Sequence, residues 1–314
     1  MGYPGAEMIG TSIKLAQQNY SLHFKAIQTL VNEFGPDLVF PLMDLSVEAN
    51  ALGRYTLFPT DDSATVPKER FDLSELERLQ TINLSCDCRV HCYVETVKLM
   101  NILLPESVLK GAYVTGPYTL AALIMGADDA AMATVLQTEA LGQLCHLATE
   151  IILDYTRMLI AAGANVVCVL EPSAVMLGPK QFQQFSADYV KHISNACRIS
   201  GAGTIYHICG NSMHLIEAMV GAEVDGLSLD SRETGIDLVK VVERVPEHVA
   251  VIGNVNPVKT MLQGSPDDVM METKHLLQAM KQVPNFVLST GCDLPKETPI
   301  ENIHAFMRAG RETP

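Results

Sequence analysis

Short apolar runs alternate along the chain with longer stretches in which apolar residues recur every three or four positions. The short runs fit strands buried on both faces, and the longer stretches fit helices with one buried face. Seven segments predict strands: residues 38–43, 111–115, 166–170, 204–208, 226–229, 249–253 and 285–289. Pro41 weakens the prediction for residues 38–43, because proline cannot donate a hydrogen bond to a neighbouring strand.

Helices are predicted between these strands. Residues 21–34 carry a helical apolar stripe that stops at Gly35. Residues 131–162 fit one long helix, and residues 79–104 fit another. The stretch 54–71 is polar and irregular, so we expect a hairpin or a lid there.

Repeated strand–helix units predict parallel strands joined by right-handed crossovers. Both an open doubly wound sheet and a (β/α)8 barrel of the TIM type fit this pattern. We favour the barrel, because no strand is followed by the Gly-x-Gly-x-x-Gly turn of a dinucleotide-binding sheet. Polar residues also follow the carboxyl ends of many different strands, as barrel active sites require. We therefore expect residues 1–314 to form a single barrel domain, with one of the eight strands missing from the count.

The composition narrows the functions that the chain can have. Hydrophobic residues make up 48%, which excludes intrinsic disorder. With 22 Lys and Arg against 36 Asp and Glu, the net charge of −14 argues against nucleic-acid and membrane partners, since both require a basic surface. No apolar run reaches the roughly 20 residues of a membrane-spanning helix, and the first residues show no signal-peptide core, so we expect a cytoplasmic protein. In that compartment the eight cysteines are free thiols rather than a disulfide framework.

The pattern His207-x-Cys209 is the sharpest chemical feature of the sequence. Residues two apart in a strand point to the same side, so both side chains can reach one ion at the strand end. Cys292 ends a later strand, and barrel closure would bring it to the same place. One imidazole and two thiolates are a typical ligand set of a catalytic zinc site with an open fourth position, and sulfur favours zinc over magnesium or calcium. Packed thiols without a metal are the alternative.

A second group, formed by Cys86, Cys88, His91 and Cys92, lies in the predicted helix 79–104. A metal or redox role competes there with ordinary packing, because free cysteine packs well on buried helix faces. We favour packing, since the group lies away from the strand ends.

The strand ends also carry a family resemblance. The residues that carry it are His207-Ile208-Cys209-Gly210-Asn211, Gly253-Asn254-Val255, Gly291-Cys292 and Thr298-Pro299-Ile300-Glu301-Asn302, together with segments 48–53, 116–120 and 161–165. In these motifs the chain resembles the methylcobamide:coenzyme M methyltransferases of the uroporphyrinogen decarboxylase superfamily. The resemblance implies a (β/α)8 barrel with zinc at its C-terminal mouth, held by His207, Cys209 and Cys292. It also implies an acidic residue near the metal, here Asp230, as a fourth ligand that an arriving thiol can displace.

The resemblance implies a function as well. A methyl group would pass from a corrinoid, which arrives on a partner protein, to a small thiol such as coenzyme M, and zinc would lower the pKa of that thiol. We take Asp230 and, from its position after a strand, Glu171 as candidate catalytic residues. The candidate substrate-binding residues, which also follow strands, are Asn211, Asn254 and Asn256.

Three other functions stay open. A related methyltransferase would run in reverse, from a methylamine, methyl thiol or methoxy compound to a corrinoid protein. A uroporphyrinogen decarboxylase is disfavoured, because the sequence has no arginine-rich N-terminal motif for its polycarboxylate substrate and that reaction needs no metal. A barrel with packed thiols would be a binding or scaffold protein.

The beginning of the chain departs from the resemblance. Family members start with a helix and a first barrel strand, and the matching region of this chain begins after that strand. We therefore expect a barrel with an unfilled position, whose strand edges are exposed, or another segment in that position.

Overall fold

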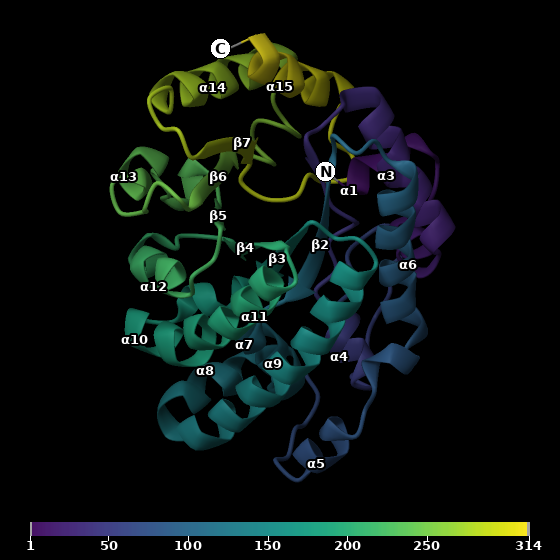
Figure 1. Cartoon of the computed structure of the whole chain (residues 1–314), viewed down its shortest axis with the longest axis vertical. Helices are drawn as coiled ribbons and strands as arrows, with labels where there is room; N and C mark the ends of the chain where they lie inside the picture. The colour runs from purple at the N-terminus through teal and green to yellow at the C-terminus, as the bar shows by residue number, and fades with distance from the viewer. Residues whose placement is uncertain (1, 313–314) are drawn as a thin grey trace.

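The computed structural model describes residues 2–312, and all seven predicted strands are present (Figure 1). The strands are β1 (Leu38–Val39), β2 (Leu109–Thr115), β3 (Val166–Leu170), β4 (Gly203–Ile208), β5 (Gly226–Leu229), β6 (Ala250–Val255) and β7 (Phe286–Thr290). The α-helices are α1 (Gly2–Met8), α2 (Ile13–Gln18), α3 (Tyr20–Phe34), α4 (Val47–Ala51), α5 (Glu75–Gln80), α6 (Cys88–Leu103), α7 (Pro117–Met125), α8 (Ala127–Leu136), α9 (Thr138–Ala161), α10 (Pro179–Phe182), α11 (Asp188–Ile199), α12 (Ile216–Gly221), α13 (Leu238–Val242), α14 (Pro266–Ala279) and α15 (Ile300–Glu312).

The strands form one parallel sheet in sequence order. Each strand pairs with the next one along the chain, from β1 to β7. Within residues 2–312 no pairing joins β7 back to β1. The barrel is therefore open between β1 and β7, and we call this opening the seam. The prediction of a barrel that lacks one strand is confirmed.

The first strand is shorter than predicted. The pattern predicts a strand over residues 38–43, but only Leu38 and Val39 pair with β2. Pro41 has no N–H to donate. The N–H of Leu42 donates instead to Nε2 of the buried His23, at 2.8 Å. The chain therefore leaves the sheet after Val39.

Two predicted helices are each broken in two. The segment 131–162 is divided between α8 and α9, because Gln137 leaves the helical conformation with φ −141° and ψ 48°. The segment 79–104 is interrupted before α6, where the side chain of Asp87 caps the first turn by accepting from two backbone N–H groups. These breaks are local, so they leave the order of strands and helices unchanged.

Two other local predictions are confirmed. The segment 21–34 corresponds to α3, which ends at Gly35 in the left-handed conformation. The irregular stretch 54–71 is a hairpin-like loop with one antiparallel bridge, between Leu57 and Thr65.

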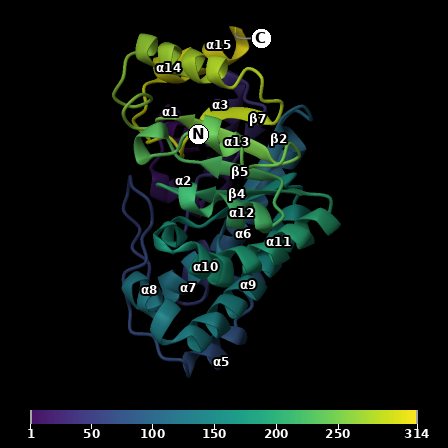
Figure 2. The ribbon, with the colours of Figure 1, turned by 90° about the vertical axis from the view of Figure 1, so that its left-hand side faces the viewer.

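The helices surround the sheet (Figures 1 and 2). The pair α14 and α15 lies at one end of the molecule, near β7, and α7, α8 and α9 lie at the other end. Phe34 of α3 and Phe306 of α15 belong to one buried apolar cluster, so these helices pack together near the seam. In the described part of the chain no single helix is long and apolar enough to cross a membrane, and α7 and α8 pass that test only as a pair bent by 109°.

Candidate metal centre

The three predicted ligands meet at the carboxyl ends of β4 and β7. His207 lies in β4, Cys209 follows on the same side, and Cys292 follows β7 after Gly291. A Cβ atom at position 291 would lie 2.5 Å from the backbone nitrogen of Ser231, so glycine is required for this close approach. Among residues 2–312 these three side chains are the one group of His, Cys or acidic residues whose ligand atoms all lie within 4.8 Å of one another.

The spacing of the ligand atoms fits a tetrahedral zinc ion. Nε2 of His207 lies 3.2 Å from Sγ of Cys209 and 3.8 Å from Sγ of Cys292, and the two sulfur atoms are 3.7 Å apart. Bonds of about 2.3 Å to sulfur and about 2.0 Å to nitrogen at tetrahedral angles would separate the sulfurs by about 3.8 Å, and each sulfur from the nitrogen by about 3.5 Å. The three atoms thus lie at three corners of a tetrahedron of the size that zinc requires.

A hydrogen bond from β5 orients the imidazole of His207. Its Nδ1 lies 3.1 Å from the carbonyl oxygen and 3.0 Å from the hydroxyl oxygen of Ser228. Because a carbonyl oxygen only accepts, Nδ1 carries the proton and Nε2 presents its lone pair to the sulfur atoms. Ser228 lies directly opposite His207 in the parallel register. The apolar pattern of β5 did not indicate a role for Ser228, although a serine between two leucines of an apolar strand is a visible signal.

The two sulfurs differ in acidity. The hydrogen bond between the two thiols lowers the pKa of Cys209 and raises that of Cys292. Burial lowers the pKa of His207, but the hydrogen bond and charge of Cys292 and the charge of Asp230 outweigh burial and raise it overall. A cation that binds all three side chains must therefore displace the proton of Cys292.

Asp230 follows β5 next to the cluster, but backbone groups bind its carboxylate. The N–H of Gly210 donates to Oδ2 at 2.7 Å, and the N–H of Ser231 donates to Oδ1 at 2.6 Å. Asp230 thus joins the loops that follow β4 and β5. It does not belong to the three-residue ligand group, and it affects that group through its charge on His207.

Glu171 follows β3 and is completely buried. Its carboxylate accepts from the backbone N–H groups of Tyr118 and Thr119, at 3.0 and 2.8 Å, and from the hydroxyl of Ser186, at 2.6 Å. Burial raises the pKa of Glu171, although these hydrogen bonds act against the increase. The contacts hold the first turn of α7 against the end of β3.

Asn211 follows β4, Asn254 lies within β6 and Asn256 follows β6, and all three bond mostly to neighbouring loops. Nδ2 of Asn254 donates to the carbonyl oxygen of Asp230 at 2.8 Å. Nδ2 of Asn256 donates to Glu233 at 2.9 Å, while its Oδ1 accepts from two backbone N–H groups. Asn211 is exposed, and its Oδ1 accepts from the N–H of Met213 at 3.3 Å. Asn211 is therefore the one of the three whose side chain is most accessible to a substrate.

The second cysteine group does not converge. Cys86 and Cys88 are exposed, whereas Cys92 is buried. Nε2 of His91 contacts the carbonyl oxygen of Ser85 at 2.6 Å. No three ligand atoms of this group lie close enough to hold one ion, in the part of the chain that the structure describes.

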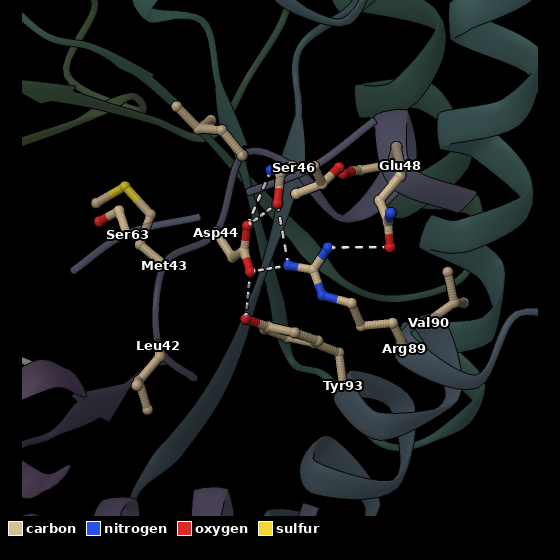
Figure 3. A network of polar contacts seen from close by, with 12 residues as sticks. Leu42, Met43, Asp44, Ser46, Glu48, Ser63, Arg89, Val90 and Tyr93 are labelled. Carbon is tan, nitrogen blue, oxygen red and sulfur yellow. Dashed lines mark hydrogen bonds and ion pairs between the residues drawn. The ribbon is translucent and has the colours of Figure 1, made fainter. Parts of the chain in front are cut away.

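A buried ion pair lies in the loop after β1, and Figure 3 shows its network. The guanidinium of Arg89, from α6, pairs with Asp44 and donates to Ser46 Oγ at 3.0 Å and to Asn50 Oδ1 at 3.3 Å. The hydroxyl of Tyr93 donates to the same carboxylate at 3.2 Å. The network ties α6 to the loop after β1, and the sequence pattern did not reveal that Arg89 is buried.

Comparison with known proteins identifies the class. The sequence profile of the uroporphyrinogen decarboxylase (URO-D) family matches residues 4–313, so the chain belongs to this family. It is 26% identical to the methylcobamide:CoM methyltransferase MtbA of Methanosarcina acetivorans over 76% of this chain and 68% of that protein. It is 30% identical to the uroporphyrinogen decarboxylase of Synechococcus sp. (strain CC9605) over 63% of this chain and 57% of that protein.

A solved structure described as a methyltransferase from Methanosarcina mazei has the same fold. The TM-score between the two structures is 0.88 at 24% sequence identity, and the match covers 99% of this chain and 91% of that chain. The predicted resemblance to the methylcobamide:coenzyme M methyltransferases within this superfamily is confirmed. The names of these relatives also support the prediction of an enzyme of the methyltransferase type.

Proposed function

We propose that this chain is a zinc-dependent methyltransferase that moves a methyl group from a methylated corrinoid, carried by a partner protein, to a small thiol such as coenzyme M. One observation carries the proposal: the ligand atoms of His207, Cys209 and Cys292 have the spacing of a tetrahedral zinc centre. The similarity to methylcobamide:CoM methyltransferases supports a methylated corrinoid as the donor and a thiol as the acceptor. We propose the whole of residues 1–314 as one barrel domain that carries out this reaction.

The side chains of the site have separate tasks in this proposal. His207, Cys209 and Cys292 would hold zinc, and Ser228 would fix the tautomer of His207. When bound, zinc supplies Lewis acidity that lowers the pKa of a thiol to favour the nucleophilic thiolate. In the overall reaction a carbon–sulfur bond forms and the carbon–cobalt bond breaks, with its electron pair left on cobalt and the thiol proton released to solvent.

We propose positioning roles for the two predicted carboxylates. Asp230 would hold the backbone around Cys209 through the N–H of Gly210. Glu171 would hold the first turn of α7 at the end of the barrel that carries the site. Asn211 would contact the substrate or the incoming corrinoid, while Asn254 and Asn256 would fix the loops around it.

Metal analysis of the purified protein tests the site. We expect one zinc per chain in the wild type and loss or strong weakening of zinc binding in Cys292→Ser. Cys86→Ser is the matched control, because this thiol is exposed and lies outside the ligand group. A wild-type protein without zinc that folds and behaves identically to Cys292→Ser would contradict the proposal and favour a barrel with packed thiols.

The activity assay distinguishes the direction of transfer. Zinc-loaded protein should consume methylcobalamin in the presence of a thiol. The change in the absorption spectrum of the corrinoid measures this consumption. Methylation of a reduced corrinoid by a methylamine, methyl thiol or methoxy compound, without thiol methylation, would assign the reverse reaction. Release of carbon dioxide from uroporphyrinogen would assign the decarboxylase instead.

A further inference from the structure

A cavity of about 220 Å³ connects the seam to the candidate metal ligands. Residues of the two seam strands, such as Leu38 and Val287, line its outer part. Ile205 lines its middle, inside the barrel, and His207 and Cys292 line its inner end. The cavity therefore gives access to the ligand atoms from the interior of the barrel. We call it the seam cavity.

We propose that the seam cavity is the binding site of the acceptor thiol, and that the thiol is uncharged or cationic with an apolar body of several carbon atoms. This inference rests on the proposed function, because it takes the metal ligands at the inner end as the place where the sulfur reacts. It narrows the acceptor class of that function to thiols without an anionic group, and coenzyme M, whose sulfonate is an anion, would then not be the preferred acceptor.

The size and lining of the seam cavity support an apolar occupant. Ile205 and Ile252 present apolar side chains to it, and the rings of Phe40 and Tyr113 stack along it with their centroids 4.5 Å apart. A dry protein cavity of about 150 Å³ can hold benzene. The seam cavity is larger, so it has room for the carbon chain of a six-carbon thiol.

The charges around the seam cavity disfavour an anion. No Lys or Arg is among the described residues that line it, whereas Asp37 and Asp293 are. Arg311 lies near the seam, but its guanidinium donates to the carbonyl oxygens of Phe34 and Gly35. At the inner end, two thiolate ligands would offset the charge of a zinc ion. A sulfonate in this cavity would lose its hydration without gaining a cationic partner.

Thiol binding tests the inference without relying on turnover. Isothermal titration calorimetry of the zinc-loaded and the metal-free protein should use two probes: mercaptohexanol and 2-mercaptoethanesulfonate. We expect mercaptohexanol to bind the zinc-loaded protein at least about tenfold more tightly than the sulfonate, and to lose most of its affinity without zinc. Equal or tighter binding of the sulfonate would overturn the inference but leave the proposed methyl transfer to coenzyme M standing.

Two variants locate the site. Val287→Trp places a large ring at the seam, where Val287 is 45% exposed, and should weaken mercaptohexanol binding about tenfold. Val239→Trp is the matched control, because Val239 is 46% exposed and does not line the cavity. Asp37→Asn should improve sulfonate binding and leave mercaptohexanol unaffected, since it removes one carboxylate from the outer part.

Each outcome separates the two proposals. Unchanged mercaptohexanol binding in Val287→Trp, with an unchanged unfolding midpoint, would place the thiol elsewhere and overturn the inference. If the zinc-loaded protein binds none of the thiols and consumes no methylcobalamin in their presence, the proposed function itself fails, and the inference fails with it.

Discussion

Replacing Arg89 with methionine removes the cation from the buried network after β1 and keeps an apolar side chain of similar length. The exposed fraction is 6% for the side chain of Arg89 and 0% for that of Asp44, so water cannot replace the lost partner. The variant also loses hydrogen bonds to Ser46 and Asn50 and the stacking of the guanidinium over the ring of Phe58, 4.7 Å from its centroid. Asp44 then remains as a buried charge without a cation.

Removing one partner of a buried ion pair costs about 3–5 kcal/mol. Unfolding entropy is about 2.1 cal/mol/K per residue. For a chain of 314 residues this loss lowers the thermal midpoint by about 5–8 °C. Asp44 keeps its hydrogen bonds from Ser46 and Tyr93, so we expect a folded protein with reduced stability.

Urea denaturation followed by circular dichroism measures the effect. Arg157→Met is the matched control, because that arginine is 59% exposed, and its ion pair with Asp154 should contribute at most about 1 kcal/mol. The double variant Arg89→Met with Asp44→Asn should regain part of the lost stability, since it leaves no unpaired charge. The reasoning is refuted if Arg89→Met loses no more stability than Arg157→Met.

Three further predictions address other residues. Burial lowers the pKa of His23 to about 3 from 6.5, so the folded state resists protonation and stability is lost as pH falls below 6.5. The difference in unfolding free energy between the wild type and His23→Phe should therefore narrow by about 3 kcal/mol from pH 7 to pH 4. Burial also raises the pKa of Glu48 to about 7, but Glu48 is present in both proteins, so its contribution cancels in the difference. A difference that stays constant with pH would refute the lowered pKa of His23. Glu171→Gln should lower the unfolding free energy by about 1–3 kcal/mol, because an amide cannot accept hydrogen bonds at both of the positions that the carboxylate oxygens occupy. The kcat of the folded fraction should stay unchanged. A loss of kcat without a loss of stability would instead make Glu171 a catalytic residue. Asp230→Asn should weaken zinc binding by about 10-fold in competition with a chelator, whereas unchanged affinity would remove its positioning role.

The sequence predicts the strands and the ligand group for a physical reason. Strands buried on both faces must be apolar along their whole length, so each appears as a short continuous run. The alternation of side chains in a strand places His207 and Cys209 on one side without reference to the rest of the fold. Cys292 joins them because the ends of parallel strands meet at one edge of the barrel.

The remaining features depend on contacts between segments that are distant in sequence. The first strand ends early because Pro41 has no N–H to donate and because the side chain of His23 binds the N–H of Leu42. Pro41 is visible in the sequence, but no local pattern encodes the bond to His23. Ser228 reaches His207 only through the register between β4 and β5. The contacts of Glu171 with α7 likewise join residues more than fifty positions apart. Such bonds become visible only when the tertiary arrangement is known.

The sequential order of the strands bears on how the chain folds as it leaves the ribosome. Within residues 2–312 each strand pairs only with its neighbours in sequence, so every strand made after β1 finds its pairing edge already present. Growth of the sheet can then follow translation from β1 to β7, and Cys292, on the loop after β7, is the last of the three proposed ligands to be made. Under the proposed function, metal capture would therefore come after most of the sheet has been assembled.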